Sequence, residues 1–192
     1  MDNEERPHAL DIMPKSLDQL PEDMRTYFDK CQEKLGFIPN VLLSYSFDDA
    51  KLRIFIAMHD DLMLGPSGLS KLEREMIAVV VSSHNHCFYC LSAHGALVRF
   101  RSGDPLLGEQ IVMNYRSADL TEKQRAMLDF AWELTAKPAE VDEDARQVLR
   151  DAGWSDRDIW DISAITGFFN MSNRMATAID MRPNDDYAVM MR

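Results

Sequence analysis

Two cysteines and one histidine that lie close together in the sequence carry the side chains best suited to chemistry. Cys87 and Cys90 form a Cys-x-x-Cys motif, and His94 follows Cys90 by four residues. On a helix, residues three or four positions apart share a face, so the His94 imidazole would lie one turn beyond the Cys90 sulfur. Two thiols that can close into a disulfide beside an imidazole suit a redox site. The same three side chains also suit a metal site.

The residues before the motif predict that a helix begins within a few residues of Cys87. Residues 82–86 read Ser-Ser-His-Asn-His, a polar stretch that is expected to end one helix before the next begins. In the first turn of a helix, unpaired backbone amides and the helix dipole favour a thiolate over a thiol. This placement favours a functional role for the cysteines over the alternative that they are two small buried side chains.

Glu75 is an acid that the helical pattern around it does not require. One straight helix from Glu75 to Cys90 would separate the two residues by roughly 22 Å, since each residue adds about 1.5 Å. They can meet only if residues 82–86 turn the chain back, so that a helical hairpin forms over about residues 70–100. Glu75 could then hydrogen-bond His94, orient its ring and stabilise its imidazolium. The alternative is a solvated residue on a helix surface.

The elements that must position these side chains are all predicted to be helices. Capping boxes occur at Ser70–Glu73, Thr121–Gln124 and, with a shorter acid, Ser155–Asp158, and apolar residues follow each at helical spacing. Alternation with a period of two is missing. The sequence therefore predicts an all-α fold. Residues 69–77 and 120–128 also resemble each other, which leaves open an internal helical repeat.

Length and composition predict one domain over residues 1–192, with an extended N-terminal segment over about residues 1–20. The net charge of -11, with no cluster of Lys and Arg, argues against nucleic acid as a partner. No apolar run approaches the roughly 20 residues that span a bilayer, and no secretory signal is visible, so a cytoplasmic location without membrane attachment is expected. In a reducing compartment, three cysteines argue for metal or redox chemistry rather than a disulfide framework.

A Cys/His metal-binding sensor protein is the alternative from a different class. Five donors occur within eleven residues: His84, His86, Cys87, Cys90 and His94. Structural zinc sites usually take their ligands from two separated pairs, and the sequence has no second cluster. We therefore predict no metal, and His84 and His86 are expected to be solvated.

The order and spacing of the site residues resemble a known family. Glu75, eleven residues, Cys87-x-x-Cys90, three residues and His94 match the active-site pattern of AhpD-like alkylhydroperoxidases within the carboxymuconolactone decarboxylase family. Residues 35–40 (Leu-Gly-Phe-Ile-Pro-Asn) and 168–174 (Phe-Phe-Asn-Met-Ser-Asn-Arg) are similar to its peroxidase-related branch. The resemblance implies an AhpD-like helical bundle, a homo-oligomer and thiol-dependent reduction of peroxides.

The resemblance also implies a role for each site residue. Cys90 would be the peroxidatic cysteine, Cys87 the resolving cysteine, and Glu75 with His94 the proton relay. AhpD enzymes carry a relay histidine between the two cysteines, whereas this chain has Tyr89 there. A phenol with a reference pKa near 10 is a poor base at neutral pH. Either His84 or His86 would have to replace it, or the activity would be weak.

The sequence thus predicts a thiol-dependent peroxidase that works through a Cys87/Cys90 dithiol–disulfide cycle. A thiolate on Cys90 would attack a hydroperoxide and become a sulfenic acid, and Cys87 would condense with it to form a disulfide. An external thiol reductant would reopen that bond. The cycle needs no haem, flavin or nicotinamide cofactor, and no Gly-rich nucleotide loop is visible. A second alternative is a dithiol–disulfide oxidoreductase that acts on another protein.

Overall fold

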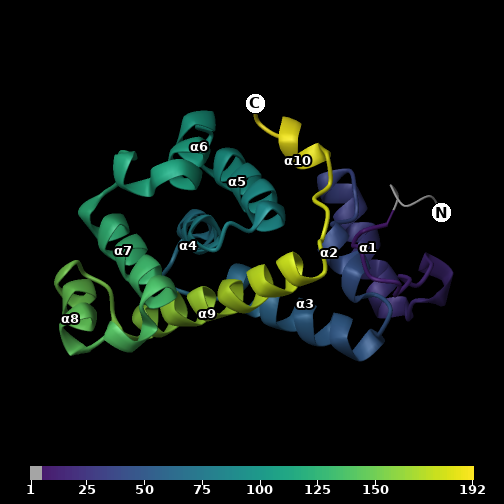
Figure 1. The fold of residues 1–192 in the computed structure, drawn as a ribbon, viewed down its shortest axis with the longest axis horizontal. Helices are drawn as coiled ribbons and strands as arrows, with labels where there is room; N and C mark the ends of the chain where they lie inside the picture. Colours follow the sequence, from purple (N-terminus) through teal and green to yellow (C-terminus); the bar gives the residue numbers. More distant parts are fainter. Residues whose placement is uncertain (1–5) are drawn as a thin grey trace.

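The computed structural model describes residues 6–192, and every regular element in that range is helical (Figure 1). The elements are η1 (Leu17–Gln19), α1 (Glu22–Leu35), α2 (Asn40–Tyr45), α3 (Asp49–Leu64), α4 (Lys71–His84), α5 (Phe88–Ser102), α6 (Pro105–Asn114), η2 (Tyr115–Ser117), α7 (Glu122–Ala136), η3 (Pro138–Glu140), α8 (Glu143–Asp151), α9 (Asp156–Ala178) and α10 (Asp186–Val189). The all-α prediction is confirmed for this range. Part of the expected extended segment, residues 1–5, lies outside it, and residues 6–16 form no helix.

All three predicted capping boxes are present and begin the three helices α4, α7 and α9. At α4, for example, the Glu73 amide donates to the Ser70 hydroxyl at 3.2 Å, and the Ser70 amide donates to the Glu73 carboxylate at 2.8 Å. Each box satisfies backbone amides that the first turn of a helix leaves unpaired. Helices α4 and α7, whose starts look alike in sequence, also pack against each other.

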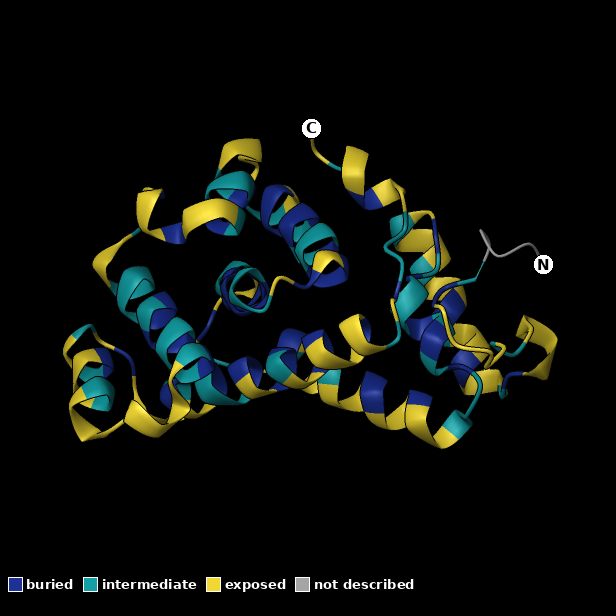
Figure 2. Ribbon diagram, viewed as in Figure 1, coloured by how far each residue is buried: buried dark blue, intermediate teal, exposed yellow. Residues whose placement is uncertain are grey.

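Helix α4 lies at the centre of the molecule and is surrounded by other helices. It packs against α5, α6, α7 and α9, and Figure 2 shows it end-on inside a ring of partly exposed helices. Residues 74–82 are all buried, so this part of α4 is covered on every side. A helix buried on all sides needs apolar residues all round, which explains the run Met-Ile-Ala-Val-Val-Val at residues 76–81. A carboxylate in such a helix requires partners, and Glu75 is that carboxylate.

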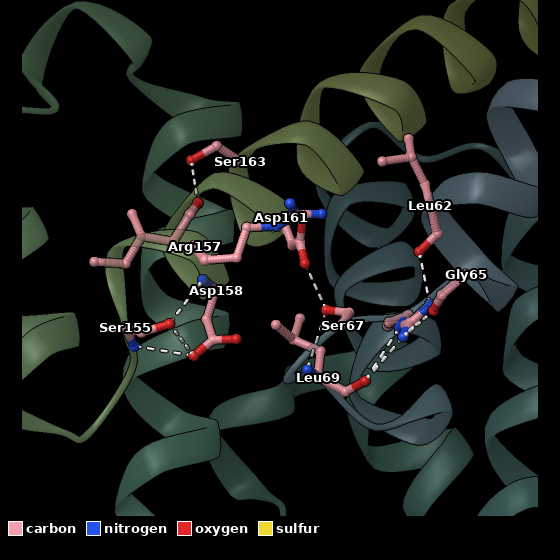
Figure 3. A network of polar contacts seen from close by, with 11 residues as sticks. Leu62, Gly65, Ser67, Leu69, Ser155, Arg157, Asp158, Asp161 and Ser163 are labelled. Carbon is pink, nitrogen blue, oxygen red and sulfur yellow. Dashed lines mark hydrogen bonds and ion pairs between the residues drawn. The ribbon is translucent and has the colours of Figure 1, made fainter.

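The start of α4 is fixed by a buried arginine. The Arg74 guanidinium donates to the carbonyl oxygens of Leu62 at 3.1 Å, Gly65 at 2.8 Å and Leu69 at 3.1–3.2 Å (Figure 3). These carbonyls belong to the end of α3 and the loop that follows it. Arg74 therefore ties α3, the loop and the first turn of α4 together, and it does so one residue before Glu75.

The same loop is tied to α9 on its other side. The Ser67 hydroxyl donates to the buried carboxylate of Asp161 at 2.6 Å, and Arg157 donates to the same carboxylate at 3.1 Å (Figure 3). Gly68 faces Asp158 so closely that a Cβ on it would lie 2.0 Å from a carboxylate oxygen. The close approach explains a glycine at this position. The loop holds α4 at a fixed depth between α3 and α9.

The C-terminal segment lies against α5. The buried Arg99 guanidinium donates to the carbonyl oxygens of Tyr187 at 2.9 Å and Met190 at 3.1 Å, which holds α10 on α5 (Figure 1). The residues between α9 and α10 are joined to the N-terminal segment, since the Arg182 amide donates to the Pro7 carbonyl at 2.9 Å.

Within residues 6–192, no helix combines the length and the apolar character needed to cross a bilayer.

Candidate functional site

Helices α4 and α5 form a hairpin whose turn is residues 85–87. Asn85 ends α4, His86 adopts a left-handed backbone conformation with φ of 53°, and Cys87 is the N-cap of α5 with φ of -82° and ψ of 101°. The predicted start of a helix at Cys87 is confirmed. The left-handed residue reverses the chain within a few residues, and α5 then runs back along α4.

The hairpin brings Glu75 and His94 into direct contact. Nδ1 of His94 lies 2.7 Å from Oε2 of Glu75, and the side chains are 12% and 4% exposed. Because an ionised carboxylate only accepts hydrogen bonds, Nδ1 carries a hydrogen, and in the neutral form of the ring Nε2 is the basic nitrogen. The edge of the His94 ring packs against Phe169 of α9, with 4.6 Å between ring centroids. The predicted approach of these two residues is confirmed.

Glu75 has a second partner that sequence reasoning missed. Nε of Arg101 donates to Oε1 of Glu75 at 3.3 Å. Arg101 follows His94 by seven residues, two turns of α5, and that spacing was the available signal. Burial raises the pKa of Glu75, but the hydrogen bond and charge of His94 and the charge of Arg101 outweigh burial and lower it. Glu75 is therefore ionised at neutral pH.

The two thiols lie next to each other but are chemically different. Cys87 and Cys90 are free cysteines, 1% and 2% exposed. The Cys90 thiol donates to the Cys87 sulfur, and this hydrogen bond is the main cause that lowers the pKa of Cys87 to about 6. The backbone amide of Cys90, the Thr177 hydroxyl and the nearby His94 act in the same direction, against burial. The thiolate is therefore favoured at Cys87.

The pKa of the Cys90 thiol is shifted in the opposite direction, upward. Its hydrogen bond to Cys87, its burial and the negative charge on Cys87 raise its pKa well above the ordinary value. Ser172 and Asn173, both on α9, hydrogen-bond Cys90 and oppose that rise without reversing it. Sequence reasoning also missed these α9 residues, which lie about 80 positions away, although the similarity of residues 168–174 to the peroxidase-related branch had marked this segment.

Tyr89, which replaces the relay histidine of AhpD enzymes, has a structural role. The Val41 amide donates to its hydroxyl oxygen at 2.9 Å, which joins α5 to the start of α2. Burial raises the pKa of Tyr89 well above its ordinary value, so the phenol stays neutral and cannot act as a base. Phe37, Met181 and Tyr187 pack with it around the two thiols, so segments from both ends of the chain cover the site.

Neither His84 nor His86 replaces the relay histidine. The His84 ring packs edge-on against Trp132, with 5.8 Å between centroids, and His86 is exposed in the turn. Within residues 6–192, no group of three or more His, Cys, Asp or Glu side chains is arranged to hold a metal ion. The geometry gives the metal-binding alternative no support.

The fold and the paired thiols define an AhpD-like helical protein, and comparison with known proteins specifies the family. Residues 51–105 match the profile of the carboxymuconolactone decarboxylase family. A search of curated proteins gave no significant match.

Two solved structures are similar over nearly the whole chain. An uncharacterized peroxidase-related protein from Silicibacter sp. TM1040 is 59% identical, with 97% of this chain and 96% of that chain covered and a TM-score of 0.92. A second such protein, with an alkylhydroperoxidase AhpD core, from Ralstonia eutropha JMP134, is 45% identical, with 97% of both chains covered and a TM-score of 0.92. The chain therefore belongs to the carboxymuconolactone decarboxylase family, in its AhpD-like, peroxidase-related branch.

A more distant structure shares the fold alone. The debrominase Bmp8 is 20% identical, with 94% of this chain and 95% of that chain covered and a TM-score of 0.79. The family and its similar structures indicate a general peroxidase-like role, whereas the fold by itself does not define a substrate.

Proposed function

We propose that this protein is a thiol-dependent peroxidase that reduces hydroperoxides through a Cys87/Cys90 dithiol–disulfide cycle. One observation carries the proposal: two free, buried thiols, Cys87 and Cys90, hydrogen-bond each other next to a buried Glu75–His94 pair, and that hydrogen bond lowers the pKa of Cys87. A thiolate is the nucleophile in thiol chemistry, so such a cysteine is ready to react at neutral pH. The relatives named as peroxidase-related support a peroxide as the substrate class.

The proposed cycle balances in two steps. In the first, the Cys87 thiolate attacks the terminal oxygen of the hydroperoxide, the O–O bond breaks, and the leaving alkoxide takes a proton from solvent to become an alcohol. Cys87 is then a sulfenic acid. In the second, the Cys90 sulfur attacks Cys87, the S–O bond breaks, and water leaves as the disulfide forms. His94, oriented by Glu75, is the base that accepts the Cys90 proton through one bridging water and returns it to the leaving oxygen.

This order of attack reverses the order that the family resemblance implied. The resemblance implied attack by Cys90, and the position of His94 four residues beyond Cys90 agreed with that assignment. Within the described residues, His94 has no direct hydrogen bond to either sulfur, whereas three donors converge on Cys87. The donors favour the thiolate at Cys87, and the raised pKa of Cys90 suits the thiol that acts second.

Return to the dithiol requires an external thiol reductant. The loop between Cys87 and Cys90 is very short, so its disulfide gains little from restricting the unfolded chain and should be reduced readily. Each turnover then consumes two thiols of the reductant and one hydroperoxide, and yields one disulfide of the reductant, one alcohol and one water.

Steady-state kinetics with two substrate classes test this function. The protein would be supplied with hydrogen peroxide or an organic hydroperoxide, or with a protein disulfide, and a small dithiol would serve as reductant. We expect turnover with peroxide that is abolished by Cys87→Ser and unchanged by Cys31→Ser. Cys31 is a matched control because burial raises the pKa of its thiol to about 11. Turnover with the protein disulfide alone would instead favour the dithiol–disulfide oxidoreductase.

A further inference from the structure

We propose that Arg101 is a positioning residue that keeps the Glu75 carboxylate ionised and thereby holds the hydrogen of the neutral His94 imidazole on Nδ1, which leaves Nε2 free to accept a proton. The inference rests on the proposed function only in taking Cys87 and Cys90 as the reacting groups. It concerns the geometry and charge of the groups behind them.

The two oxygens of the Glu75 carboxylate are divided between two partners on α5. Oε2 accepts from Nδ1 of His94 at 2.7 Å, and Oε1 accepts from Nε of Arg101 at 3.3 Å. Residues seven positions apart lie two turns apart on the same helix face, so both partners reach Glu75 from one side. The carboxylate cannot rotate about its last bond without losing one of these hydrogen bonds.

Burial makes the second partner necessary. The Glu75 side chain is 4% exposed, and a carboxylate removed from water is costly unless charged or hydrogen-bonding groups compensate. A protonated Glu75 could donate a hydrogen bond to Nδ1, which would place the imidazole hydrogen on Nε2 instead. Nε2 would then no longer be free to accept a proton. Arg101 favours the ionised form of Glu75 and so favours the productive tautomer of His94.

Other charged or titratable groups lie near Glu75, and their effects on its carboxylate must be distinguished from the effect of Arg101. His59 of α3 lies close enough to Glu75 to influence its charge, and Tyr187 of α10 is influenced by Glu75 in turn. Arg74 of α4 lies near Arg101, but its hydrogen bonds go to backbone carbonyls. Arg101 is the one described Lys or Arg side chain that contacts the Glu75 carboxylate directly.

Nitrogen NMR of His94 tests the inference directly. In long-range ¹H–¹⁵N spectra of the reduced protein at pH 7, the wild type and Arg101→Lys should carry the hydrogen on Nδ1. Arg101→Met should give a mixture of tautomers or the Nε2–H form. Arg146→Met, which removes an exposed arginine on α8, is the control and should resemble the wild type. Because the tautomer is read without substrate, this result is independent of whether peroxide is the substrate.

A kinetic double-mutant cycle complements the spectra. Arg101→Met should slow disulfide formation by oxidant about tenfold, within the range of general acid–base effects, and move the acid edge of the rate profile to higher pH. In a Glu75→Gln background the same change should have less than about a twofold effect, because the carboxylate through which Arg101 acts is gone. If Arg101→Met folds poorly, Arg101→Gln replaces it. An Nδ1–H tautomer and an unshifted pH profile in the folded Arg101 variant would overturn the inference.

Discussion

Removal of the Cys90 thiol should make Cys87 a much weaker nucleophile. With a pKa of about 6, one unit below pH 7, the Cys87 thiolate outnumbers its thiol by about ten to one. At the ordinary value of 9.0, two units above pH 7, the ratio would be about one to a hundred. Cys90→Ala deletes the donor that contributes most to this difference.

The loss of Cys87 thiolate in Cys90→Ala depends on the hydrogen-bond donors to Cys87 that remain. A full return to 9.0 would lower the thiolate fraction at pH 7 about ninetyfold. The backbone amide of residue 90 and the Thr177 hydroxyl still point at the sulfur, so we expect a smaller fall of about tenfold. Cys90→Ser keeps a hydroxyl donor and should fall less, and Thr177→Val should cause a smaller loss in the same direction.

Alkylation of Cys87 by iodoacetamide, followed by mass spectrometry between pH 5 and pH 9, measures this effect. A Cys31→Ser background removes the third thiol from the assay. The midpoint of the rate profile should lie near pH 6 in the dithiol protein and move upward in Cys90→Ala. A midpoint near 9 in the dithiol protein, or one that Cys90→Ala leaves in place, would refute the reasoning.

Three further variants probe the surroundings of the dithiol. Glu75→Gln should slow peroxide oxidation of the dithiol by at least about tenfold in stopped-flow measurements. Glu75 also has a lowered folded-state pKa, so it contributes stability that is present above its unfolded value of about 4.3 and lost as pH falls through the folded value. Urea unfolding of Glu75→Gln should therefore depend less on pH in that window than unfolding of the wild type. Arg74→Met leaves the carbonyls of Leu62, Gly65 and Leu69 without their donor and should lower the free energy of unfolding by about 3–5 kcal/mol. Arg146→Met should change it by less than about 0.5 kcal/mol. Arg99→Met removes the hydrogen bonds that hold α10 on α5 and should raise the alkylation rate of Cys87 severalfold. Amide exchange should become faster only in the C-terminal segment. Equal alkylation rates in the variant and the wild type would mean that α10 does not control access to the thiols.

Local sequence patterns predicted the helices and the hairpin because both depend on neighbours in the chain. Ser70 and Glu73 cap the first turn of α4 with groups three residues apart, and such short-range geometry is visible in the sequence. The polar residues 82–86 likewise predict a break in the helix. Because that break allows a hairpin, the sequence could predict Glu75 as a partner for His94. Peroxide and thiol reductant as substrates, and a homo-oligomer, remain predictions from the resemblance.

The order proposed for the two thiols rests on contacts that residue spacing does not reveal. The hydrogen bond between Cys90 and Cys87 affects both pKa values most, and Thr177, Ser172 and Asn173 of α9 add smaller contributions that appear only once α9 packs against α5. The resemblance implied Cys90 as the attacking thiol, whereas the start of a helix at Cys87 favours the thiolate there. In the folded chain the His94 imidazole hydrogen-bonds Glu75, and the hydrogen bonds that Cys87 accepts at the start of α5 lower the pKa of Cys87.

The most direct test of the proposed cycle is a single turnover of the reduced protein with one equivalent of hydroperoxide. Mass spectrometry should find one disulfide between Cys87 and Cys90, formed with the loss of two hydrogens, while Cys31 stays reduced. With Cys90→Ser, a sulfenic acid should be trapped on Cys87, and Cys87→Ser should leave the peroxide largely unconsumed. A sulfenic acid on Cys90 in Cys87→Ser, and none on Cys87 in the reciprocal variant, would reverse the two roles. Dithiol that remains reduced in the presence of peroxide would contradict the peroxidase function itself.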